Sequence, residues 1–172
     1  MFEVDQKTEL FEVRRLEVSD VEDYRTIRLA ALAGAPDSFG SVYEVERDRP
    51  LAEFTARLAT STIFGAFAGG QIIGMAGFKQ ETGLKHQHKG VVWGVYVRRQ
   101  ARGQGIGAAL VAAVVEYARD VVDQLTLTVV QGNDAALALY QKCEFQPYGM
   151  EPRALKTAVG YADEVLMWRQ LG

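Results

Sequence analysis

The amino-acid sequence predicts an α/β sandwich built on a mixed sheet, in a single domain of 172 residues. Three observations predict this class. Two strand-like runs, 63–68 and 71–79, flank the two-residue turn Gly69-Gly70 and indicate a hairpin. The near-continuous apolar run 91–97 is typical of a strand buried on both faces. A glycine-rich turn, a helix, a strand and a second helix then follow, so strand–helix units adjoin the hairpin.

The other elements follow from local patterns. Ser19 and Glu22 have the spacing of a capping box, and apolar side chains repeating about every 3.6 residues predict a helix after it. Pro50 suits the first turn of a second helix. Segments 37–49 and 150–163 are expected to be long irregular loops, which often carry binding function. The remaining expected strands are 11–15, 125–130, 145–148 and 164–168, and the remaining helices are 50–59, one from Ile106, and 133–143.

The composition argues against several partners. The formal net charge is −3, whereas proteins that bind nucleic acid usually carry a basic surface. No apolar stretch approaches the roughly 20 residues of a membrane span, and the N-terminus lacks a leader pattern, so a cytoplasmic protein is expected. Cys143 is the single cysteine, which fits a reducing compartment. Two histidines and one cysteine are too few for a usual structural zinc site, so no metal is expected.

The turn after the strand 91–97 has the features of an anion site. Gly103, Gly105 and Gly107 alternate, and the lack of Cβ atoms lets the backbone turn tightly and approach a ligand closely. The N–H groups at the start of the following helix and the helix dipole favour a phosphate. Arg98, Arg99 and Arg102 are expected to add positive charge beside it. The competing interpretation is an ordinary glycine-rich turn before a helix.

Two common phosphate ligands fit the turn poorly. A Walker A loop places Lys and then Ser or Thr after its last glycine, but here Ala108-Ala109 follows Gly107. A dinucleotide-binding turn needs Gly-x-Gly-x-x-Gly and an acid at the end of the next strand. The spacing here is Gly-x-Gly-x-Gly, and the next strand ends in Val130-Gln131. Nucleotide hydrolysis and dehydrogenase chemistry are therefore disfavoured.

The chain resembles the GNAT superfamily of N-acetyltransferases, whose main signature is Arg/Gln-x-x-Gly-x-Gly/Ala. Arg102, Gly105 and Gly107 match this signature. The second signature is matched by Asn133, Ala136, Leu139-Tyr140 and Phe145, at the expected distance along the chain. One departure is Glu144, where the family usually has glycine, and it puts the turn after this helix in question. The resemblance implies one N-acetyltransferase domain over 1–172, with a mostly antiparallel sheet flanked by helices on both faces.

The resemblance also implies acetyl-CoA as the cofactor. Its pantetheine arm would pair with the strand edge at 95–97, its pyrophosphate would lie on the N–H groups of 102–107, and Asn133 would contact the cofactor. The cofactor-binding residues implied in this way are Val95, Tyr96, Val97, Arg102, Gly103, Gln104, Gly105, Ile106, Gly107, Ala108, Asn133 and Tyr140.

Two residues are the catalytic candidates. Within the second signature Tyr140 is expected near the thioester sulfur, as the acid that protonates the leaving thiolate; alone, a helical tyrosine is more often a packing residue. The strand 91–97 contains neither an acid nor a histidine, so the expected base is His88, just before it, with His86 and Glu81 as weaker candidates. Cys143 is expected to be a small buried residue and not a nucleophile.

The expected function is acetyl transfer from acetyl-CoA to a primary amine of a small molecule or peptide, by direct attack on the thioester. A non-catalytic acyl-CoA-binding regulatory module on the same fold is one alternative. Transfer of another acyl group, or to another acceptor, is a second. The resemblance also makes a homodimer an expected assembly, and the sequence does not identify the acceptor.

Overall fold

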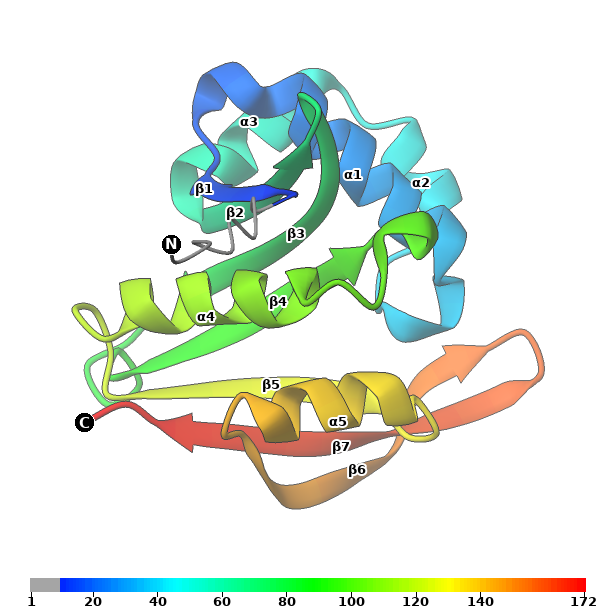
Figure 1. The fold of residues 1–172 in the computed structure, drawn as a ribbon. Coiled ribbons are helices and arrows are strands. Elements are labelled where there is room, and N and C mark those ends of the chain that lie inside the picture. Colours follow the sequence, from blue (N-terminus) through cyan, green and yellow to red (C-terminus); the bar gives the residue numbers. More distant parts are fainter. Residues whose placement is uncertain (1–9) are drawn as a thin grey trace, which may run out of the picture.

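The computed structural model describes residues 10–172, which form one seven-stranded sheet with helices on both faces (Figure 1). The beginning of the expected domain and most of the stretch that lacks a leader pattern, residues 1–9, lie outside the described residues. The strand order is β1-β2-β3-β4-β5-β7-β6. The strands are β1 (Glu12–Arg15), β2 (Thr62–Ala68), β3 (Gln71–Gln80), β4 (Lys89–Val97), β5 (Gln124–Val130), β6 (Gln146–Thr157) and β7 (Gly160–Gln170).

Helices cover the two faces of the sheet and enclose two separate cores (Figure 1). On one face, Tyr24, Ile27 and Phe54 are fully buried against β2 and β3. On the other, Leu110 and Val114 pack with Leu125 and its neighbours. The helices of the first face are α1 (Val21–Gly34), α2 (Tyr43–Arg47) and α3 (Leu51–Thr60), and those of the second are α4 (Ile106–Ala118) and α5 (Asp134–Lys142). This arrangement confirms the predicted fold class.

The parallel contact between β4 and β5 has the fewest paired residues of any strand pair in the sheet. β4 and β5 pair only from Lys89 to Val91 against Gln124 to Thr126, while every other neighbouring pair is antiparallel. In β4 the register against β3 shifts between Met75↔Tyr96 and Gly77↔Trp93, so β4 carries one extra residue. Gly94 lies in this bulge with φ of 63°. A bulge bends its strand, and here β4 diverges from β5 beyond Val91.

Three local predictions need correction. The capping box is formed not by Ser19 and Glu22 but by Glu17 and Asp20 around the 3₁₀ turn η1 (Val18–Asp20), where Glu17 N donates to Asp20 Oδ2 at 2.7 Å. Arg14 fixes the position of the Asp20 carboxylate with two hydrogen bonds of 2.8 and 2.9 Å and lowers its pKa.

The two expected loops contain regular structure. Segment 37–49 includes α2 and part of the 3₁₀ turn η2 (Pro36–Ser38). Segment 150–163 is not a loop, because β6 and β7 continue through it as one long hairpin that extends beyond the rest of the sheet (Figure 1). The register shifts between Glu151 and Leu155, and Arg153 has φ of 54°, so this irregularity hides the two-residue period of the strand.

Candidate active site

Two connected pockets open where β4 and β5 diverge. The loop-side pocket, of about 500 Å³, lies against the glycine turn and the first residues of α4. The strand-side pocket, of about 400 Å³, lies against the open face of β5 and includes Trp93, Thr128 and Glu164. Both pockets include Tyr140 and Asn133. The structure therefore places these two side chains where the pockets meet.

The glycine turn ends in a helix start with unpaired donors. Gly105 is the N-cap of α4 with φ of 81°, and Gly103 has φ of 78°, conformations that favour glycine. The Ala109 N–H donates to the Gly105 carbonyl at 3.0 Å, so the N–H groups of the three preceding helical residues have no intrahelical partner. Those residues line the loop-side pocket, which makes its wall a site for an anionic group.

The three arginines near the turn do not act alike. Arg102 lines the loop-side pocket, and its Nε donates to the Val97 carbonyl at 3.0 Å. Arg98 faces β3 instead, where its Nε donates to the Ile72 carbonyl at 3.0 Å. Arg99 is exposed and does not line the pocket. Of the expected positive charges, the structure brings only that of Arg102 to this pocket.

Helix α5 is fixed at both ends, and this fixes Tyr140. The Asn133 Oδ1 accepts from the Ala136 N–H at 3.2 Å, so Asn133 caps the helix. At the other end the Phe145 N–H donates to the Tyr140 carbonyl at 2.9 Å and the Glu144 N–H to the Gln141 carbonyl at 3.0 Å, which is a Schellman motif. Glu144 adopts φ of 66°, so it forms the left-handed turn that the family's glycine would form.

Tyr140 is 8% exposed, and its ring packs edge-on against Phe145 with centroids 6.2 Å apart. Burial, with a smaller contribution from the nearby Cys143, raises the pKa of the Tyr140 phenol well above its ordinary value. The phenol is therefore neutral at pH 7 and can donate a hydrogen bond into the junction of the two pockets.

Comparison with known proteins identifies the family. Residues 27–145 match the Acetyltransferase (GNAT) family. The chain belongs to the GNAT acetyltransferase family. It is therefore an acetyl-CoA-dependent N-acetyltransferase, as the sequence predicted.

Individual relatives agree with this assignment. The chain is 34% identical over 125 residues to the N-alpha-acetyltransferase RimI of Mycobacterium tuberculosis, covering 72% of this chain and 76% of that protein. It is 27% identical over 99 residues to an L-methionine sulfoximine/L-methionine sulfone acetyltransferase of Pseudomonas aeruginosa, covering 57% and 58%. The fold matches a putative acetyltransferase from Salmonella typhimurium, solved with its cofactor acetyl-CoA, with a TM-score of 0.80 at 20% identity and 94% coverage of both chains.

The structure brings together nearly all of the predicted cofactor-binding residues of this GNAT chain. Each of them lines the loop-side pocket except Gln104. Sequence reasoning missed Ser38 and Phe39, which line both pockets. The signal for them was the segment that begins at Asp37, which was expected to be a binding loop without any residue being singled out.

The expected base is not at the junction. His88 is exposed and precedes β4, seven residues before Val95, which at about 3.3 Å per residue is about 23 Å away along the strand. Its carbonyl accepts from the Asp123 N–H at the far end of the β4–β5 contact. His86 is likewise exposed, and Glu81 lies 3.9 Å from Lys89. None of these three lines either pocket.

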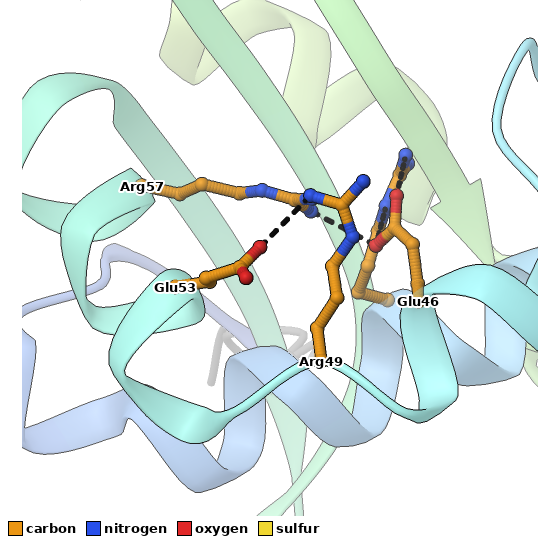
Figure 2. Close-up of polar contacts among 5 residues, drawn as sticks. Glu46, Arg49, Glu53 and Arg57 are labelled. Carbon is orange, nitrogen blue, oxygen red and sulfur yellow. Dashed lines mark hydrogen bonds and ion pairs between the residues drawn. The ribbon is translucent and has the colours of Figure 1, made fainter.

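A buried ion cluster supports the strand-side pocket from α1, α2 and α3. Arg28, which lines this pocket, donates from Nε and Nη2 to the Glu46 carboxylate at 3.2 and 3.0 Å. Arg57 donates to Glu46 Oε2 at 2.9 Å, and the exposed pair Arg49–Glu53 lies beside them (Figure 2). Glu46 is 1% exposed, so these buried ion pairs hold Arg28 in place in the pocket wall.

Residues 10–172 were also compared with the requirements of a metal-ion site and of a membrane-spanning helix. No group of three or more His, Cys, Asp or Glu side chains within residues 10–172 could hold a metal ion. No helix in the same range is long and apolar enough to cross a membrane.

Proposed function

We propose that this protein transfers the acetyl group of acetyl-CoA to a primary amine of a small molecule or peptide. The observation that carries the proposal is the junction of the two pockets at Tyr140. One pocket has the lining that a phosphate-bearing cofactor needs, and the other is open for an acceptor. The acetyl carbon and the amine then meet at the junction, where a direct attack on the thioester is a single displacement.

The loop-side pocket suits the cofactor in two ways. The free N–H groups of Ile106, Gly107 and Ala108, with Arg102, match the negative charge of a pyrophosphate. On the β5 side, the edge of β4 beyond Val91 has no strand partner among residues 10–172, so its backbone groups are free for the amides of a pantetheine arm. The side-chain NH₂ of Asn133, whose amide oxygen caps α5, would add a further contact.

Tyr140 is proposed as the acid. When the amine attacks, the carbon–sulfur bond breaks and the sulfur must gain a proton. A neutral phenol at the junction can supply it, and such acid assistance is typically worth about 10² to 10⁴ in rate. The raised pKa of Tyr140 keeps that proton on the phenol until negative charge develops on the sulfur.

An amine acceptor is supported by the names of the relatives. One is an N-alpha-acetyltransferase, and the other acts on methionine sulfoximine and methionine sulfone. The first name specifies transfer to an alpha nitrogen, and the second names amino-acid derivatives, so the two acceptors are of different kinds. The proposal therefore stays at a primary amine of a small molecule or peptide.

The test is release of thiol from acetyl-CoA in the presence of amino acids, polyamines, aminoglycosides or peptides with a free α-amine, with mass spectrometry of the product. Propionyl-CoA in the same assay tests the alternative of another acyl group. A protein that binds acetyl-CoA by calorimetry yet releases no thiol with any acceptor would instead be a non-catalytic binding module.

The expected homodimer and cytoplasmic location belong to the same proposal. The free, half-buried thiol of Cys143 suits a reducing compartment. Light scattering of the purified protein tests the dimer, and fractionation of the native cells tests the location.

A further inference from the structure

The strand-side pocket contains one carboxylate among the described residues that line it. Its titratable side chains are Arg28, Tyr140, Tyr148 and Glu164. Arg28 directs two of its nitrogens to Glu46, and the two tyrosines carry phenol groups, not carboxylates. Glu164 is half-buried and forms no ion pair with any other residue of 10–172. It is therefore the group in this pocket that can attract an ammonium ion and accept a proton.

Strand register places Glu164 on the open face of the sheet. Glu164 is opposite Val130, and Leu166 is opposite Thr128, so these side chains point to one face. The alternate residues Leu127 and Val129 are buried against α4 and α5 on the other face. Glu164 therefore extends into the pocket from β7, across the gap from Trp93 on β4.

We infer that Glu164 binds the ammonium group of the acceptor in the strand-side pocket and removes its proton. The inference rests on the proposed acetyl transfer and assigns the base, for which the sequence had suggested His88. An N–H bond of the ammonium breaks and the proton passes to a Glu164 carboxylate oxygen, which leaves a lone pair on nitrogen. Nitrogen then bonds to the acetyl carbon of acetyl-CoA while the carbon–sulfur bond breaks. Ammonium and thioester become amide, thiol and one proton, which Glu164 releases to solvent.

The surroundings of Glu164 suit this role. Burial raises the pKa of its carboxyl, hydrogen bonding with Thr128 opposes that rise, and the carboxylate of Glu151 raises it again. Glu151 is directly opposite Glu164 on β6 and is exposed. Arg28, Tyr140 and Tyr148 are the other charged or titratable groups that line the pocket. A carboxylate whose pKa is moved toward neutrality is a more effective base at pH 7.

The test compares Glu164→Gln with Glu151→Gln, which removes the opposite carboxylate on β6 outside the pocket lining and should lower kcat/KM far less, through the Glu164 pKa alone. Spermidine and a tetrapeptide with a free α-amine are the ammonium probes, and hydroxylamine is the probe that is largely neutral at pH 7. We expect Glu164→Gln to lower kcat/KM for the ammonium probes by about 10² to 10⁴. The loss should be much smaller with hydroxylamine, and should shrink as the pH rises toward the pKa of the acceptor amine. Acetyl-CoA affinity measured by calorimetry should stay at the wild-type value.

Three results would overturn the inference. They are a Glu164→Gln enzyme with the wild-type rate and pH profile, an equal loss with the ammonium and neutral probes, and an equal loss in Glu151→Gln. A wild-type protein that acetylates none of the probes would instead remove the proposed function, on which the inference depends. An active wild-type enzyme with an unaffected Glu164→Gln variant removes the inference alone.

Discussion

Glu46 offers the sharpest test of how the molecule is held together. Its carboxylate accepts hydrogen bonds of 2.9 to 3.2 Å from Arg28 and Arg57, and its side chain is 2% exposed. Glu46→Gln keeps the shape of the side chain but removes the negative charge, so two guanidinium groups lose their counter-charge inside the protein. Breaking a buried pair by removing one partner costs about 3 to 5 kcal/mol of unfolding free energy.

The pKa of Glu46 gives a second value for the same quantity. Burial alone would raise this pKa, but hydrogen bonds from Arg28, Arg57 and Ser41 outweigh burial and lower it from 4.5 to about 2. That difference corresponds to about 3 kcal/mol. Because the pKa is depressed in the folded state, this stabilisation is fully present above about pH 4.5 and is lost as the pH falls toward about 2.

Urea unfolding followed by tryptophan fluorescence, at pH 7 and at steps down to pH 3, measures both effects. Glu46→Gln should be less stable at pH 7 and should lose less stability than wild type on acidification. Glu53→Gln is the control, because it removes the exposed partner of Arg49 and should cost at most about 1 kcal/mol (Figure 2). If Glu46→Gln is as stable as Glu53→Gln at pH 7, the buried cluster does not contribute the unfolding free energy given above.

Three further predictions concern the site. Tyr140→Phe should lower kcat by about 10² to 10⁴ with unchanged acetyl-CoA affinity, and a near wild-type kcat would make Tyr140 a packing residue. Gly105→Asp should weaken acetyl-CoA binding in calorimetry by at least about tenfold, because it places an anion at the helix start and disfavours φ of 81°; unchanged affinity in the folded variant would contradict the assignment of the loop. His88→Ala should keep the wild-type dependence of kcat/KM on pH, since the side chain is exposed and outside both pockets. If the variant lost the fall of kcat/KM at low pH, His88 would again be the candidate base.

The predicted site residues that the structure brings together belong to short continuous motifs. The conformation of Gly105 follows from its place between a turn and a helix, and Asn133 is one of the residue types that cap helices. Glu144 shows the limit of such reasoning. Its replacement of glycine put the turn in question, yet the turn forms, with the Arg169 guanidinium 2.6 Å from the Glu144 carboxylate and 2.7 Å from the Cys143 carbonyl.

What the sequence did not predict depends on contacts between distant strands. Glu164 enters the pocket because β7 pairs with β5 in one register, and a shift of one residue would turn its side chain to the other face. The position of His88 outside the pockets has a related origin. His88 is close to β4 in sequence, but the site lies at the other end of that strand, where the bulge at Gly94 bends it away from β5. Neither the register nor the direction of the bend can be read from composition or periodicity.

The short β4–β5 contact has a consequence for how the molecule responds to its cofactor. Only three residue pairs join β4 to β5, and so join strands β1 to β4 to strands β5 to β7. A bound molecule that contacts both β4 and β5 therefore adds contacts between these two parts of the sheet. Occupancy then stabilises the native state by mass action, with a gain of about 2.7 kcal/mol at one hundred times the dissociation constant. Amide protons of β4 beyond Val91 should exchange with solvent more slowly in the bound state, so hydrogen exchange with and without acetyl-CoA measures this added stabilisation.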